Sequence, residues 1–303
     1  MTDLVVRKIR WEFDGTVPFL WQPANPNFAL FCNAFTFVAV PFERYIIKAL
    51  RPVQDRFEDP AVAAEADAFL RQEGQHAAAH RKHMDALIAR YPGLQRAHDD
   101  ATTAFDRLID EHPVEYHAAY IANLEATFTP LFKVFLDHRD SLFGGADRKV
   151  AALMAWHFVE EVEHRSSGLR LSRALSPDPW YRVRLVRPTF RHVTDVMAQI
   201  AATMDEAVPP ADRGASAREL MSPKLLVDEL RYRGPGGGRR RARRGGVPTL
   251  FGTVGTGDLL SMLWRLTLSQ LPNHDPARQP LPDYADVWRA EYRRGTDMTS
   301  FAC

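Results

Sequence analysis

The sequence predicts an all-α protein. In its long apolar stretches the apolar residues are spaced as in helices. No segment shows the strict alternation of polar and apolar residues that marks a half-buried strand. Glycine and proline residues lie between these stretches, where they end helices. Two of the stretches also contain a Glu-x-x-His pattern, whose two side chains share a face when the segment is helical.

The composition is that of a soluble globular protein. Apolar residues make up 46% and charged residues 25%, with a net charge of +1, so no nucleic-acid partner is expected. Cys32 and Cys303 are too few for a disulfide framework. The first residues lack the order of a signal peptide. The longest apolar run, 28–42, is shorter than the roughly 18 residues of a membrane span. We expect a cytoplasmic protein without a membrane span.

The first predicted helix follows an irregular lead-in. Residues 1–27 contain Pro18, Pro23 and Pro26, which limit regular structure. The following segment, 28–50, is apolar on nearly every side over much of its length, as a buried helix is. Glu43 is the first charge after its apolar run. Taken alone, this carboxylate is either exposed and paired with Arg44 or Lys48, or buried as part of a functional site.

The second predicted helix begins at Pro60 and is rich in alanine. Glu73, His76 and His80 lie at i, i+3 and i+7 and therefore share a face. His83 continues toward the rim of that face, and we expect it to be solvated. A Pro-Gly pair ends the segment that follows.

Two further long helices are predicted after a short polar one near 97–110. The first covers 114–138, with Glu125 on an apolar face and Pro130 predicting a kink. The second covers 147–175 and carries the second Glu-x-x-His pair.

In this last helix Glu161 and His164 form the pair, and His157 lies one turn before Glu161. The three side chains share one face. Imidazoles and a carboxylate on one stripe are costly to bury unless a cation holds them together. Glu160 and Glu163 flank this face, and we expect them to be salt-bridged or exposed.

The remainder of the chain predicts shorter helices near 188–207, 217–232, 259–271 and 284–292. Between the second and third lies a basic stretch, 233–246, rich in glycine and arginine, which we expect to form a mobile solvated loop.

The charged residues of the four long helices repeat one order, a single Glu followed by Glu-x-x-His. One such match is expected about half the time by chance, so only the repetition carries weight. The single Glu and the pair are separated by 30 residues in the first half (43 to 73) and 36 in the second (125 to 161), which suits a helix, a turn and an antiparallel return. The pattern consists of Glu43, Glu73, His76, Glu125, Glu161 and His164.

This pattern resembles the ferritin-like proteins that hold two iron or manganese ions in a bundle of four helices. The resemblance implies a ferritin-like four-helix bundle over 28–176 and a C-terminal helical extension or lid over 177–303. It also implies that the six residues of the pattern are metal ligands. The fuller motifs, E-x-x-H-x-x-x-H and W-H-x-x-E-E-x-E-H, further resemble a bacterial family described as predicted metal-dependent hydrolases.

Two histidines go beyond the plain pattern. His80 and His157 each lie on the face of a Glu-x-x-His pair. Each is either an additional ligand or hydrogen-bonded to a ligating carboxylate. Beyond these metal-site candidates, the sequence identifies no catalytic residue.

Oxygen and nitrogen ligands without thiolate suit iron, manganese or zinc. The resemblance implies two metal ions, and we expect iron, with manganese or zinc as alternatives. Two functions remain open. The first is activation of O₂ to oxidise a small organic substrate, with a ferredoxin or flavin reductase as electron donor. The second is a two-metal hydrolase that uses a metal-bridging hydroxide on an ester, amide or phosphate. The association of such helix-borne pairs with redox chemistry favours the first.

The substrate is not identified by the sequence. Four phenylalanines can line a pocket or serve as core: Phe31, Phe35, Phe128 and Phe158. A homodimer is left open.

Overall fold

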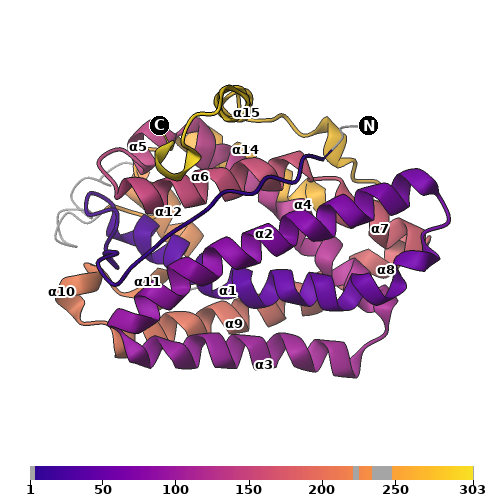
Figure 1. The fold of residues 1–303 in the computed structure, drawn as a ribbon, viewed down its shortest axis with the longest axis horizontal. Helices are drawn as coiled ribbons and strands as arrows, with labels where there is room; N and C mark the ends of the chain where they lie inside the picture. The colour runs from indigo at the N-terminus through magenta and orange to yellow at the C-terminus, as the bar shows by residue number, and fades with distance from the viewer. Residues whose placement is uncertain (1–3, 221–224, 234–247, 303) are drawn as a thin grey trace.

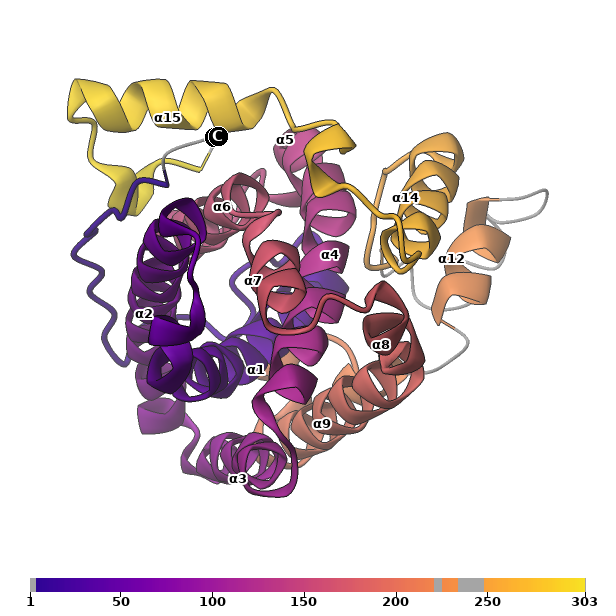
Figure 2. The same cartoon turned by 90° about the vertical axis from the view of Figure 1, so that its right-hand side faces the viewer.

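The computed structural model describes residues 4–220, 225–233 and 248–302, and within these ranges the protein is all-α, without a strand (Figure 1). Four long helical segments form the centre of the molecule, and shorter helices surround them (Figure 2). The central segments are α1 (Pro26–Leu50), α2 (Pro60–Arg90), α4 (Val114–Asp137) and α6 (Arg148–Glu163) with its continuation α7 (Ser167–Leu175).

Helix α1 forms because its start is capped and its residues are apolar. The Asn25 side chain accepts a hydrogen bond from the amide of Phe28, and Pro26 occupies the first turn. The segment 26–56 has the length and mean hydropathy of a membrane span, but 83% of its most apolar window is buried inside the protein. A buried core helix passes the same test, so the window is no evidence for a membrane.

Helix α2 begins where the sequence predicts, with Asp59 accepting a hydrogen bond from the amide of Ala61. It packs against α1 over much of its length. Helix α4 continues through Pro130, where a kink was predicted. Its Glu125 is buried on the side that faces the other central helices.

The prediction of one continuous helix over 147–175 is wrong, because the helix is broken near its centre. Helix α6 ends at Glu163, and His164 has non-helical dihedral angles of φ −90° and ψ 16°. The amide of Ser167 donates to the carbonyl of His164 at 2.7 Å, so a tight turn separates α6 from α7. The break lies at the second Glu-x-x-His pair and allows α7 to pack closely on α4.

The outer helices cover this centre on two sides. Helix α9 packs against α1, α3 and α4, and α14 packs against α4. Most predicted ends agree within a few residues. The outer helices are α3 (Gln95–Glu111), α5 (Arg139–Leu142), α8 (Pro179–Arg184), α9 (Val186–Ala207), α10 (Pro210–Arg213), α11 (Ala217–Leu220), α12 (Leu225–Arg233), α14 (Thr256–Ser269) and α15 (Tyr284–Arg294).

Two predictions fall partly outside the described residues. The helix predicted over 217–232 corresponds to α11 and α12, and the residues between them, 221–224, are not described. The basic loop predicted over 233–246 lies outside the described residues from position 234 onward.

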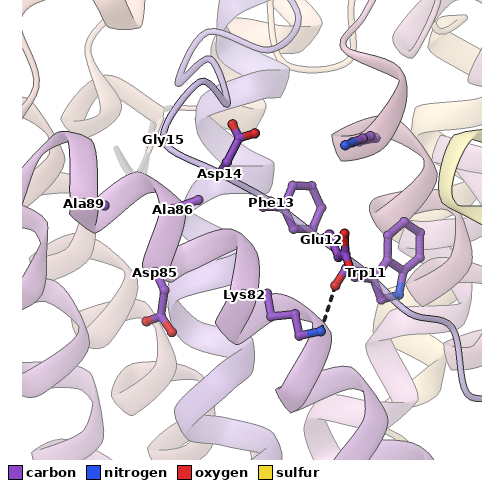
Figure 3. Close-up of a pocket in the computed structure, with 10 residues that line it drawn as sticks. Trp11, Glu12, Phe13, Asp14, Gly15, Lys82, Asp85, Ala86 and Ala89 are labelled. Carbon is purple, nitrogen blue, oxygen red and sulfur yellow. Dashed lines mark hydrogen bonds between the residues drawn. The ribbon is translucent and has the colours of Figure 1, made fainter.

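The N-terminal segment has no helix or strand among its described residues 4–25, yet it is packed (Figure 1). Trp11 and Trp21 are almost fully buried. The Lys82 ammonium of α2 donates to the carbonyl of Trp11 at 2.8 Å, which holds the segment across the helix (Figure 3). The lead-in is therefore part of the folded core, and it places Arg7 beneath α15.

Candidate metal centre

The central helices bring seven acidic and histidine side chains into one buried cluster. None of them is more than 2% exposed. Each central helix contributes at least one, as the spacing of the Glu residues predicts. The cluster comprises Glu43 from α1, Glu73 and His76 from α2, Glu125 from α4, His157 and Glu161 from α6, and His164 at its end.

Two groups of four within this cluster can each hold a metal ion, because their ligand atoms lie within 4.8 Å of one another. The first group is Glu43, His76, His157 and Glu161. In it, Nε2 of His157 lies 3.0 Å from Oε1 of Glu161, and Nδ1 of His157 lies 3.7 Å from Oε1 of Glu43.

The second group is Glu73, His76, Glu161 and His164. Here Nε2 of His164 lies 3.2 Å from Oε1 of Glu73 and 3.6 Å from Oε1 of Glu161. His76 and Glu161 belong to both groups. The two groups therefore overlap, and of the residues they share only Glu161, with its two carboxylate oxygens, could contact a cation in each.

Glu125 lies beside the second group without belonging to it. Its Oε2 is 3.3 Å from Nδ1 of His164. The close approach of α7 to α4 depends on Gly168, because a Cβ atom there would lie 2.9 Å from Cγ of Glu125. The glycine thus leaves the room that the Glu125 side chain occupies.

The cluster contains buried polar atoms that have charged neighbours but make no well-formed hydrogen bond, and a cation would satisfy them. Buried polar atoms are normally hydrogen-bonded, and each exception needs an explanation. Carboxylate oxygens and imidazole nitrogens are the donors that iron, manganese and zinc accept. The following buried atoms have no hydrogen-bond partner within the described residues: Oε2 of Glu43, Oε1 of Glu73, both oxygens of Glu125, Oε2 of Glu161, Nδ1 of His76 and both ring nitrogens of His164.

The electrostatics of the cluster lead to the same conclusion. Burial raises the pKa values of Glu43 and Glu73 well above their usual range, and burial with the charge of Glu161 raises that of Glu125 to about 7. Burial also opposes ionisation of Glu161, but the adjacent imidazoles, His164 foremost, hold its pKa well below normal. Neighbouring carboxylates raise the pKa values of His76 and His164 well above normal, although burial opposes this. The cluster thus attracts positive charge, which protonated imidazoles or bound metal ions could supply.

A second carboxylate fixes the orientation of His76. Its Nε2 lies 2.9 Å from Oε2 of Glu160, which leaves Nδ1 facing Glu161 at 3.4 Å. Glu160 in turn accepts a hydrogen bond from Arg7 at 2.9 Å. Glu160 was expected to be salt-bridged or exposed, and it is salt-bridged and fully buried.

Arg7 is held from several sides. It also pairs with Glu163, and its guanidinium lies 5.4 Å from the ring centres of Trp288 and Tyr292 on α15. The N- and C-terminal parts of the chain thus hold Arg7 where it neutralises Glu160. An imidazole whose outer nitrogen donates to a carboxylate presents a fixed lone pair to a metal.

His80 lies outside both metal groups and contacts His157 instead. Its Nε2 is 3.0 Å from Nδ1 of His157, and its Nδ1 is 3.0 Å from the hydroxyl of Thr36. Thr36 also lies 3.2 Å from Nδ1 of His83. The expectation that His83 is solvated is wrong, because it is fully buried and its ring packs on Phe13.

Comparison with protein-family models gives one match, to the family described as "Predicted metal-dependent hydrolase", over residues 5–228. The chain belongs to this family. The matched range includes the whole buried cluster, Arg7 and all of α9, and it leaves out α14 and α15. Comparisons with curated proteins and with solved structures gave no match.

The family description agrees with the two buried groups that can bind metal, so this member of the family is metal-dependent. Four contributors to the site were not among the predicted ligands: Arg7, Thr36, His83 and Glu160. Glu160 could have been suspected from the sequence, because it directly precedes the predicted ligand Glu161 in the motif. For Arg7 no local pattern exists, since it lies 153 residues from its partner.

An apolar cavity of about 230 Å³ adjoins the cluster, between α1, α4, α6 and α9. Phe31, Phe35 and Phe128 line it, as the sequence allowed. Phe158 does not line it and instead stacks on Phe132, with ring centres 4.2 Å apart.

Proposed function

We propose that this chain is a dinuclear metal enzyme that uses dioxygen to oxidise a small apolar substrate, with iron as its metal. The observation that carries the proposal is a buried carboxylate and imidazole cluster that borders an almost wholly apolar cavity. The order of the helices and their ligands is similar to that of ferritin-like proteins. We extend that similarity to the fold and treat residues 177–303 as a cover for the bundle.

The residues have separate tasks in this proposal. Two iron ions bound here would supply the electrons that reduce dioxygen. Glu161 could contact an ion in either group, and Glu43 with His157 would hold the ion that borders the cavity. Glu160 keeps Nδ1 of His76 turned inward. The apolar walls exclude water from the reacting substrate. Continued turnover requires an external electron donor, such as a ferredoxin or a flavin reductase.

Hydrolysis by the same two-metal arrangement is the second candidate, and the family description favours it. Metal ions then supply Lewis acidity that activates water and polarises an ester, amide or phosphate. The cavity provides little else for that reaction. Its described lining holds no Lys or Arg, and apart from the metal-group residues Thr127 is its one polar side chain. A phosphate or a leaving alcohol would find few partners there, so the cavity favours oxidation over hydrolysis.

The test is elemental analysis of protein purified without added metal, with an optical spectrum taken after reduction and again after exposure to air. We expect about two iron ions per chain and a spectrum that changes only with oxygen. Two redox-silent zinc or manganese ions would support hydrolysis instead. Protein without bound metal would overturn both.

A variant pair assigns any metal found to this cluster. Glu161→Gln keeps the size of the side chain but removes the charge that the two groups share, so we expect it to lose most bound metal. The control is Glu58→Gln, an exposed glutamate on the same chain. If Glu161→Gln retains the metal content of the control, the ions are bound elsewhere.

A further inference from the structure

One end of the cavity lies against the metal centre. Its inner wall contains Glu43, His157 and Glu161, which all belong to the first metal group. Glu73 and His164, which complete the second group, do not line it. A molecule in the cavity would therefore lie against the first group, and it meets the second only at Glu161, which the two groups share.

The outer part of the cavity lies between α1, α4 and α9. Phe31 and Phe128 are half-buried there, and so are Phe190, Val193 and Met197 of α9. The deeper wall is buried and aromatic. Phe35 packs edge-on against His157, with ring centres 4.9 Å apart. The cavity thus runs from a partly exposed apolar mouth to a metal-binding floor.

The volume limits the size of the occupant. An apolar cavity of about 150 Å³ holds one benzene molecule. The 230 Å³ of this cavity accordingly suits a molecule of about nine non-hydrogen atoms. Apart from Glu43, His157 and Glu161 at the floor, the described walls contain no charged side chain, so a charge away from the floor would be desolvated without compensation.

From these observations we propose that the cavity is the substrate site, and that it takes an uncharged, hydrocarbon-bodied molecule of about nine non-hydrogen atoms. Its reacting end faces the ion held by Glu43 and His157. Helix α9 forms the outer wall and sets the length of the substrate. The inference rests on the proposed function for the chemistry at the floor, but the binding site itself does not depend on the reaction.

The test is isothermal titration of the full-length, as-purified protein with two probes. Indole is uncharged, apolar and of the expected size. Uracil is also uncharged and of similar size, but its polar groups would be buried without partners. We expect indole to bind and uracil to show no binding. Equal affinity for both, or binding of neither, would overturn the inference.

Variants place the probe in this cavity. Val193→Trp fills the mouth from α9, so we expect indole affinity to fall on the order of tenfold, as for other steric mismatches in apolar pockets. The control is Gln199→Trp, which adds the same ring to an exposed position of α9. Unchanged affinity in Val193→Trp, or an equal loss in both variants, would refute the assignment.

A spectroscopic measurement tests the orientation. Cobalt(II) added to the full-length protein reports on its surroundings through visible absorption, and we expect indole to perturb that absorption. Indole binding without a spectral change would contradict the placement at the metal-binding floor. The two proposals fail separately. If the protein binds indole but takes up no metal, the proposed binding site stands and the proposed metal enzyme is refuted. If it takes up metal but does not bind indole, the proposed binding site is refuted and the proposed metal enzyme stands.

Discussion

At the scale of single residues, the metal centre depends on side chains that do not themselves belong to a metal group. Glu160 holds Nε2 of His76 and is itself neutralised by Arg7. Nε2 of His80 likewise holds Nδ1 of His157, and Thr36 holds His80 in turn, through neutral hydrogen bonds. Such contacts decide which ring nitrogen faces a cation, and losing one costs metal affinity even though the ligands remain.

The prediction at this scale concerns Glu160→Gln. The amide accepts the hydrogen bond of His76 more weakly and places an uncharged group beside Arg7, so we expect metal affinity to fall about 10- to 100-fold. Competition with a chelator of known affinity measures the change.

Glu163→Gln is the matched control for that variant, because Glu163 also pairs with Arg7, whereas the carboxylate that holds Nε2 of His76 is that of Glu160. An equal loss in both variants would show that general weakening around Arg7, and not the orientation of His76, is responsible.

At the scale of helices, the centre depends on the turn between α6 and α7. Helix α6 ends before His164, which has a non-helical conformation. Helix α7 begins at Ser167, whose hydroxyl donates a hydrogen bond to Glu65 at 2.8 Å. The restarted helix then lies against α4, with Gly168 beside Glu125. A continuous helix would not give α7 this independent position.

We therefore predict that Gly168→Ala is destabilising although alanine favours helices. Its methyl group would lie 2.9 Å from Cγ and 3.2 Å from Cβ of Glu125, atoms near the backbone that have little freedom to move. We expect a loss of about 1–3 kcal/mol in the free energy of unfolding, measured by denaturant titration, together with weaker metal binding.

Gly257→Ala serves as the comparison, since nothing lies within 4 Å of a Cβ atom at that position in α14. It should leave the free energy of unfolding unchanged or slightly raise it. Full stability in Gly168→Ala would mean that α7 and α4 adjust without cost.

At the scale of the whole molecule, distant parts of the chain meet around one charged centre. Arg7 joins the N-terminal segment to α6 and α15, and α9 closes the cavity against α1 and α4. The division at 27 and 176 remains a prediction. The contacts across both positions show that the flanking parts belong to the same site.

The centre also carries a cost that metal binding should offset. Buried carboxylates and imidazoles whose hydrogen bonds are incomplete destabilise the protein when no cation is bound. We predict that removing metal with a chelator lowers the midpoint of thermal unfolding and that adding the metal back restores it. An ion present at 100 times its dissociation constant stabilises by about 2.7 kcal/mol. Scanning calorimetry measures the shift, which should be much smaller in Glu161→Gln. An equal shift in that variant would assign the effect to another site.

The sequence by itself determined the helical class, because helix periodicity, caps such as Asp59 and breaks at glycine and proline are local properties. It also singled out the carboxylates and histidines that the structure brings together, because i, i+3 and i+7 spacing acts within one helix.

Only the tertiary structure decided which of those side chains lie together and which other residues contact them. It grouped His157 with Glu43, left His80 outside both metal groups, buried His83, and brought Arg7 to Glu160 across 153 residues. It also ended α6 at the second pair and placed α9 over the cavity. The physical reason is common to all of these. Each depends on the packing of separate helices, and a one-dimensional pattern contains no information on which faces will meet.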